Sequence, residues 1–95
     1  MKGIYKVTNK LNGKVYVSSA SNVEKKWHTI QQPGTWERFD KNPFYIDIKA
    51  YGIENFALEV IEEVEDDEAM LVREQFWKDV IRPEYNSLSE RRLFK

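Results

Sequence analysis

The side chains best suited to acid–base or metal chemistry in this chain are two tyrosines and one glutamate. Tyr5 and Tyr16 carry phenols with an ordinary pKa near 10, poor bases at neutral pH unless neighbouring cations lower that value. Glu74 lies at the edge of the apolar face predicted for a helix over residues 67–81, where a carboxylate suits a hard divalent cation. Two plainer interpretations stand beside these: the tyrosines are core residues, and Glu74 forms an i,i+4 ion pair with Lys78 worth about 0.2–0.5 kcal/mol.

Both tyrosines are predicted to lie on one β-hairpin. Residues 3–8 and 14–18 are rich in Ile, Val, Tyr and Thr and flank Asn12-Gly13, the dipeptide typical of a two-residue type I′ turn. With those two residues as the turn, the residue numbers of each cross-strand pair sum to 25, so an odd position on one strand lies opposite an even position on the other. Because opposite residues share a face and faces alternate along a strand, Tyr5 and Tyr16 lie on the same face. A loop one residue longer would place them on opposite faces.

A first helix is predicted from Ser21 to about residue 32. Ser21 followed three residues later by Glu24 is a capping-box pattern. Lys26 falls at the border of the apolar stripe, where its stem can pack while its ammonium reaches outward. His28 lies nearly opposite and is expected to be exposed. The buried stripe comprises Val23, Trp27 and Ile30.

The rest of the chain alternates helix and strand. Residues 35–41 are predicted as a packed loop, because they contain Trp36 and Phe39. Asn42-Pro43 caps and starts a second helix that Gly52 closes. The further elements are a strand over 56–64, a helix over 67–81 and an extended tail over 84–86. The last helix is expected to bury Ala69, Val72, Phe76 and Val80 at the centre of its face, with Met70, Trp77 and Ile81 to one side.

The order β-β-α-α-β-α predicts an α+β fold with a small, mostly antiparallel three-stranded sheet flanked by helices. Ninety-five residues make one domain, assigned to 1–87, with a short tail over 88–95. There is no cysteine, so disulfides and thiolate metal sites are excluded. No apolar run approaches the roughly 20 residues of a membrane span and no targeting signal opens the chain, so the cytoplasm is the default location.

Charge is distributed unevenly along the chain. The net charge is −1, but residues 1–28 hold six lysines against one glutamate, while residues 54–79 hold ten acids against two basic residues. Such polarity is compatible with a basic surface for phosphates and, equally, with solvated charge that is merely uneven.

The tyrosine motifs resemble the paired signature of the GIY-YIG nuclease family, which includes phage homing endonucleases. The residues that carry the resemblance are Gly3-Ile4-Tyr5, ten intervening residues and Tyr16-Val17-Ser18. The stretch NPFYIDIKAYGIENF and the ending REQFW…RPEYN extend it over residues 3–86. The resemblance implies hydrolysis of DNA phosphodiesters with one divalent ion, Mg²⁺ or Mn²⁺, as cofactor.

By position, the resemblance assigns site roles to five residues. Tyr5 matches the tyrosine implicated in activating water, and Tyr16 the one near the phosphate. Glu74 matches the metal ligand and Asn86 the supporting asparagine, while Lys26 stands where the family has a phosphate-stabilising arginine.

Three positions depart from the family pattern. Lys26 keeps the charge of the arginine but loses its planar two-pronged contact. Ser18 replaces the glycine of the second motif, and Ile30 replaces a histidine common four residues after the arginine. Losing one transition-state donor typically costs about 10²–10³ in rate, so these changes predict reduced activity.

Two functions therefore remain open. The leading one is a metal-dependent DNA endonuclease, weakened by the departures; the alternative is a catalytically degenerate relative that acts as a DNA-binding or protein-interaction module. Members of the family usually owe sequence specificity to a separate DNA-binding domain, and three alternatives stay open for this chain: a domain excised from a longer protein, a free-standing protein or half of a homodimer. The lysines expected to contact DNA are Lys6, Lys10, Lys14, Lys25 and Lys26.

Overall fold

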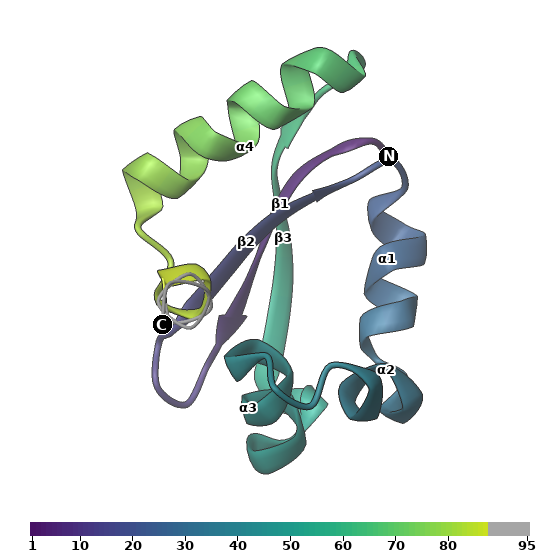
Figure 1. Cartoon of the computed structure of the whole chain (residues 1–95), viewed down its shortest axis with the longest axis vertical. Coiled ribbons are helices and arrows are strands. Elements are labelled where there is room, and N and C mark those ends of the chain that lie inside the picture. The colour runs from purple at the N-terminus through teal and green to yellow at the C-terminus, as the bar shows by residue number, and fades with distance from the viewer. Residues whose placement is uncertain (88–95) are drawn as a thin grey trace.

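A three-stranded antiparallel sheet forms the centre of the molecule, in a computed structural model that describes residues 1–87 (Figure 1). The strands are β1 (Gly3–Asn9), β2 (Val15–Ala20) and β3 (Phe56–Glu63), in the order β2-β1-β3. The helices are α1 (Val23–Ile30), α2 (Pro33–Arg38), α3 (Pro43–Tyr51) and α4 (Asp67–Ile81), with a short 3₁₀ turn over Ile53–Asn55 before β3. The predicted α+β class and antiparallel sheet are confirmed.

Helices cover both faces of the sheet because alternate residues of each strand point to opposite sides. Tyr5 and Val7 of β1 face the core shared with α1 and α3, whereas Ile4 faces the smaller core under α4. In Figure 1, α4 lies on one side of the strands and α1 to α3 lie on the other. No helix in the described part of the chain is long and apolar enough to cross a membrane.

The hairpin register differs from the prediction by two residues. Asn9 bonds to both Gly13 and Lys14, and Gly13 adopts a φ of +78°, which makes a four-residue loop over residues 10–13 that ends on a glycine in the left-handed region. Paired positions therefore sum to 23, as in Tyr5 opposite Ser18. Because 23 and 25 are both odd, the predicted sharing of one face by Tyr5 and Tyr16 is confirmed.

The first helix begins one residue later than predicted, with a different cap. Asn22, not Ser21, is the N-cap, and its side chain accepts a 3.0 Å hydrogen bond from the Lys25 backbone N–H. The predicted reciprocal partner, Glu24, instead pairs with the amino group of Met1. The capping box is therefore wrong, although the helix itself is confirmed.

Residues 33–38 form the helix α2 and not the predicted loop. Pro33 occupies its first turn, a position where the missing N–H costs nothing. Trp36 packs against the main core and donates its indole N–H to the Ile30 carbonyl, and Phe39 stacks on Tyr45. The predicted packing of these two aromatic residues is confirmed.

The fourth helix has the predicted bounds but buries a narrower face. Its contacts with the sheet come from Ala69, Met70, Trp77 and Ile81. The residues expected at the centre of the face, Val72, Phe76 and Val80, are exposed at 68%, 43% and 59%. The helix is therefore rotated about its axis relative to the expectation, and this rotation turns Glu74 toward β2.

The segment after α4 folds back in a helical turn over residues 84–87, where the sequence predicted an extended tail. Ser87 N–H bonds to the Pro83 carbonyl. Tyr85 is buried and its hydroxyl joins Asn9 and Asp47 through bonds of 3.2 and 2.7 Å. The tail assigned to 88–95 lies outside the described residues.

Candidate active site

Tyr5 lies in the middle of β1 with its side chain fully buried. Its hydroxyl has no hydrogen-bond partner among residues 1–87. Burial raises the pKa of Tyr5 well above its ordinary value, and the nearby Tyr16 adds to the increase, while the Ser18 hydroxyl offsets part of it. Neighbouring cations do not bring this pKa down, because desolvation of the phenolate is the largest cause of the shift.

Tyr16 lies half-buried on the same face of the hairpin. Its ring stacks on Phe44 of α3 with centroids 4.3 Å apart and an interplanar angle of 6°. Burial also raises the pKa of Tyr16, whereas the Ser18 hydroxyl and the Lys78 ammonium act in the opposite direction. Glu74 raises the pKa of both Tyr16 and Tyr5, so its charge acts on the two phenols.

Glu74 lies on the other side of the sheet from the tyrosine pair and contacts β2. α4 packs against β2 and β1, and β2 is an edge strand. One carboxylate oxygen of Glu74 accepts a hydrogen bond from the Ser19 hydroxyl on β2, and the other lies 2.8 Å from the Lys78 ammonium. The Glu74–Lys78 ion pair expected from their i,i+4 spacing does form, and it lies within the candidate site.

Lys25 and Lys26 of α1 lie near Ser19. Together with Ser19, Ala20, Ser21, Asn22 and Thr29 they line a surface groove that begins beside the Ser19–Glu74 bond. Lys26 is half-buried, which matches the expectation of a packed stem with an outward ammonium. Ile30, at the position of the family histidine, is fully buried in the main core and does not line this groove.

Asn86 lies close to β2 through its side-chain amide. It donates to the Val17 carbonyl and accepts from the Val17 N–H, both at 2.8 Å. Both polar atoms of its amide are therefore hydrogen-bonded, and these bonds hold the 84–87 turn against the edge strand that carries Tyr16 and Ser19. The geometry makes Asn86 a positioning residue.

The hairpin lysines are not gathered with Lys25 and Lys26. Lys6 follows Tyr5 and points to the opposite face of the sheet, where its ammonium lies 3.8 Å from Glu59. Lys10 is exposed in the hairpin loop and Lys14 follows that loop. Of the five predicted DNA-contacting lysines, two line the groove beside Ser19.

Two residues of the site were not singled out by sequence reasoning as functional. Ser19 is the next residue after the second motif, and strand alternation turns it toward α4, away from the tyrosines. Lys78 was noted only as a partner for Glu74 within the helix. The periodicity of β2 and α4 gives the face on which each residue lies. That both contact Glu74 at one place depends on how the helix packs on the sheet.

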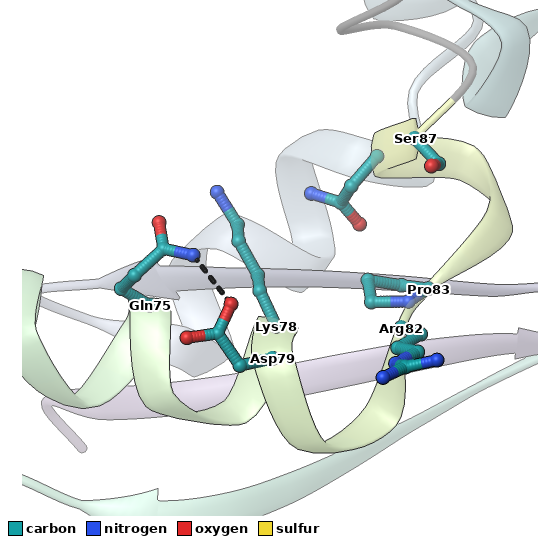
Figure 2. Close-up of a pocket in the computed structure, with 7 residues that line it drawn as sticks. Gln75, Lys78, Asp79, Arg82, Pro83 and Ser87 are labelled. Atoms are coloured by element: carbon teal, nitrogen blue, oxygen red, sulfur yellow. Dashed lines mark hydrogen bonds between the residues drawn. The ribbon is translucent and has the colours of Figure 1, made fainter.

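A second groove adjoins the site at the C-terminal end of α4. Figure 2 shows the Gln75–Asp79 hydrogen bond at one end of this groove and Arg82 with Pro83 at the other. Lys78 lines the groove and also bonds to Glu74. Charged and polar side chains therefore border Glu74 on both sides.

The donor set fits a single weakly held divalent ion better than a protein-enclosed metal centre. Residues 1–87 contain no group of three or more His, Cys, Asp or Glu side chains placed to hold a metal. Glu74 contributes one carboxylate, and Mg²⁺ is the ion that binds through one or two carboxylates while keeping several waters. The chemistry of the residues present is compatible with that ion.

Comparison with known proteins agrees with this geometry. The GIY-YIG catalytic domain family matches residues 1–86. The catalytic domain of the homing endonuclease I-TevI superimposes with a TM-score of 0.74 at 28% identity, over 90% of this chain and 94% of that one. A variant of that intron endonuclease domain with one glutamate replaced by alanine gives a TM-score of 0.69 at 28% identity, over 86% of each chain. No curated protein sequence matches. The chain therefore belongs to the GIY-YIG catalytic domain family, a family of nuclease domains.

Proposed function

We propose that this domain hydrolyses phosphodiester bonds of DNA with the help of a divalent metal ion at Glu74. The observation that carries the proposal is that Glu74 is bonded to Ser19 on β2, the edge strand whose opposite face carries Tyr16 beside Tyr5. A groove with two lysines begins at the same point. A carboxylate and ammonium groups beside a strand that also carries a phenol suit the charge that develops during phosphodiester hydrolysis.

Glu74 would hold the ion, since its carboxylate is the acidic group joined to the hairpin at Ser19. When bound, a divalent ion polarises the phosphodiester and stabilises the leaving oxygen. The Lys78 ammonium now neutralises one oxygen of Glu74 at 2.8 Å, so ion binding competes with this contact. This competition favours weak metal affinity, which in turn favours assays at high Mg²⁺ or Mn²⁺.

The tyrosines act as neutral phenols in this proposal. Because burial raises the pKa of Tyr5 and Tyr16, neither supplies a phenolate at neutral pH in the free protein. The Tyr5 hydroxyl is buried and unpartnered, so it retains a free donor and acceptor for a water molecule that enters the site when DNA binds. Lys26 supplies a point charge for the phosphate where an arginine would supply two parallel hydrogen bonds.

A degenerate, DNA-binding relative is the second candidate. The Lys78–Glu74 pair favours it specifically, because the carboxylate expected to hold the metal already has an internal cation. The lysine at position 26 and the serine at position 18 weaken catalysis without removing the basic groove. In both candidates the partner is DNA, and sequence specificity comes from an additional DNA-binding domain or from a second copy of the chain.

A plasmid-nicking assay separates the two candidates. The parent and Glu74→Gln proteins are incubated in excess over supercoiled DNA with Mg²⁺, with Mn²⁺ or with a chelator. The glutamine keeps the shape and the Ser19 contact but loses the charge needed for a metal ion. Nicking by the parent alone, abolished by the chelator, establishes the nuclease. Absence of nicking by both proteins, with DNA binding retained, establishes the binding relative.

A further inference from the structure

The groove at the end of α4 has the composition of an anion-binding surface. It lies between the last turns of α4 and the 84–87 turn and is lined by Gln75, Lys78, Asp79, Arg82, Pro83, Asn86 and Ser87 (Figure 2). Among residues 1–87 the one carboxylate that lines it, on Asp79, accepts a 2.9 Å hydrogen bond from the Gln75 amide. That pair lies at the end of the groove away from Arg82 in Figure 2, so the Arg82 end is basic.

Arg82 is held in this groove by an unusual backbone conformation. It has φ +54° and ψ +59°, the left-handed region, at the C-cap of α4 where glycine is the usual residue. It is the one residue other than glycine with positive φ in the part of the chain described. Arg82 is exposed and forms no ion pair with any residue of 1–87. A strained backbone that carries an unpaired guanidinium is the kind of feature that function retains.

Lys78 connects this groove to Glu74. Its ammonium is half-buried and 2.8 Å from the Glu74 carboxylate, and its side chain also lines the groove. On the other side of Glu74, Ser19 lines the Lys25–Lys26 groove. The two grooves therefore flank one carboxylate along the β2 edge.

We propose that the Arg82 groove binds a backbone phosphate of the same DNA that is cleaved at Glu74, a neighbour of the scissile phosphodiester. The Arg82 guanidinium makes the contact, because its planar donors match phosphate oxygens, and Lys78 adds charge from the Glu74 side. The DNA backbone then crosses the β2 edge from the Lys25–Lys26 groove to the Arg82 groove. This inference rests on the proposed DNA function and adds a second phosphate subsite to it.

The test measures DNA binding without cleavage. Fluorescence anisotropy of a labelled duplex is recorded in chelator over a series of salt concentrations for the parent and Arg82→Gly proteins. Glycine removes the charge and relieves the left-handed strain, so the fold is retained, which thermal melting verifies. We expect weaker binding at every salt concentration, and a slope of log affinity against log salt that is smaller by about one, as for one lost phosphate contact.

Two further variants separate a local contact from net charge. Arg82→Lys keeps the cation and is expected to restore most of the salt slope. Lys49→Gln removes an exposed charge from α3, at the opposite end of the molecule from α4 in Figure 1, and is expected to leave the slope unchanged. DNA binding with an unchanged slope in Arg82→Gly, or an equal loss in Lys49→Gln, overturns the subsite and leaves the nuclease proposal standing. Absence of DNA binding by the parent overturns both.

Discussion

The side-chain amide of Asn86 pairs with both backbone polar groups of Val17, at 2.8 Å each. β2 is the edge strand of the sheet, so its outward N–H and C=O groups would otherwise face solvent or another chain. The amide occupies them at the residue between Tyr16 and Ser18. One side chain thus blocks the edge and holds the 84–87 turn against the strand that carries the site.

Asn86→Ala is expected to lower the free energy of unfolding by about 1–3 kcal/mol, because two part-buried backbone groups lose their partner. Urea unfolding followed by circular dichroism measures the change. Ser87→Ala is the matched control, since Ser87 is exposed on the same turn. An unchanged transition midpoint for Asn86→Ala contradicts the positioning role.

Tyr5→Phe is expected to stabilise the protein while abolishing nicking. The phenol hydroxyl is buried and has no partner among residues 1–87, so its removal relieves an unsatisfied polar group worth about 1 kcal/mol. Thermal melting and the nicking assay report the two effects separately. Tyr51→Phe, on an exposed α3 tyrosine, is expected to change neither. A destabilised Tyr5→Phe protein would show that the hydroxyl is satisfied in solution.

Lys26→Arg is expected to raise the nicking rate, by up to about 100-fold if the arginine regains a two-pronged phosphate contact in the transition state. Lys26 is half-buried on α1 and lines the groove beside Ser19, so the longer side chain has room to reach the same point. Single-turnover rates at saturating protein give the comparison. Lys49→Arg, at an exposed position on α3 away from the groove, serves as the control. A rate equal to or below that of the parent removes the lysine as the cause of weak activity.

Stability is expected to fall as the solution becomes strongly alkaline. Burial raises the pKa of Tyr45 and Tyr85 to about 12, from an ordinary value of 10.0 in the unfolded chain. Above pH 10 the unfolded chain therefore loses protons that the folded protein keeps, so the stability present below pH 10 is lost as the pH rises through about 12.

Melting temperatures recorded over this range test the expectation. Tyr45→Phe is expected to reduce the slope with pH, and Tyr51→Phe to leave it unchanged, since Tyr51 is exposed. A slope that Tyr45→Phe does not alter contradicts the assignment of this pH dependence to a buried phenol.

Local patterns predicted the elements that depend on neighbouring residues. Asn42-Pro43 and Gly52 bound α3 as expected, and the acidic start and Arg82-Pro83 end bound α4 at Asp67–Ile81. Caps, turns and strand alternation act over a few residues, so the sequence alone carries them. The shared face of Tyr5 and Tyr16 followed from alternation even though the loop was misjudged, because the register error was an even number.

The sequence does not decide which face of α4 packs on the sheet, because the helix carries two overlapping apolar stripes. Val72, Phe76 and Val80 make the more regular one, yet the partly buried Trp77 and Ile81 are the residues that pack against Ile4 and Val17 of the sheet. The choice between stripes depends on the shape of the surface that receives the helix, and part of that surface, Ile4 and Val17, belongs to strands far away in the chain.

By itself, the sequence determined the hairpin, the helices α1, α3 and α4, and the presence of two tyrosines, a glutamate and an asparagine at family positions. Only the tertiary structure decided that the Tyr5 hydroxyl is buried without a hydrogen-bond partner among residues 1–87. The same holds for the hydrogen bonds of Asn86 to Val17 and for the contacts of Glu74 with Ser19 and Lys78. The physical reason is that propensity and capping are short-range, whereas desolvation and side-chain pairing depend on which distant segments the fold packs together.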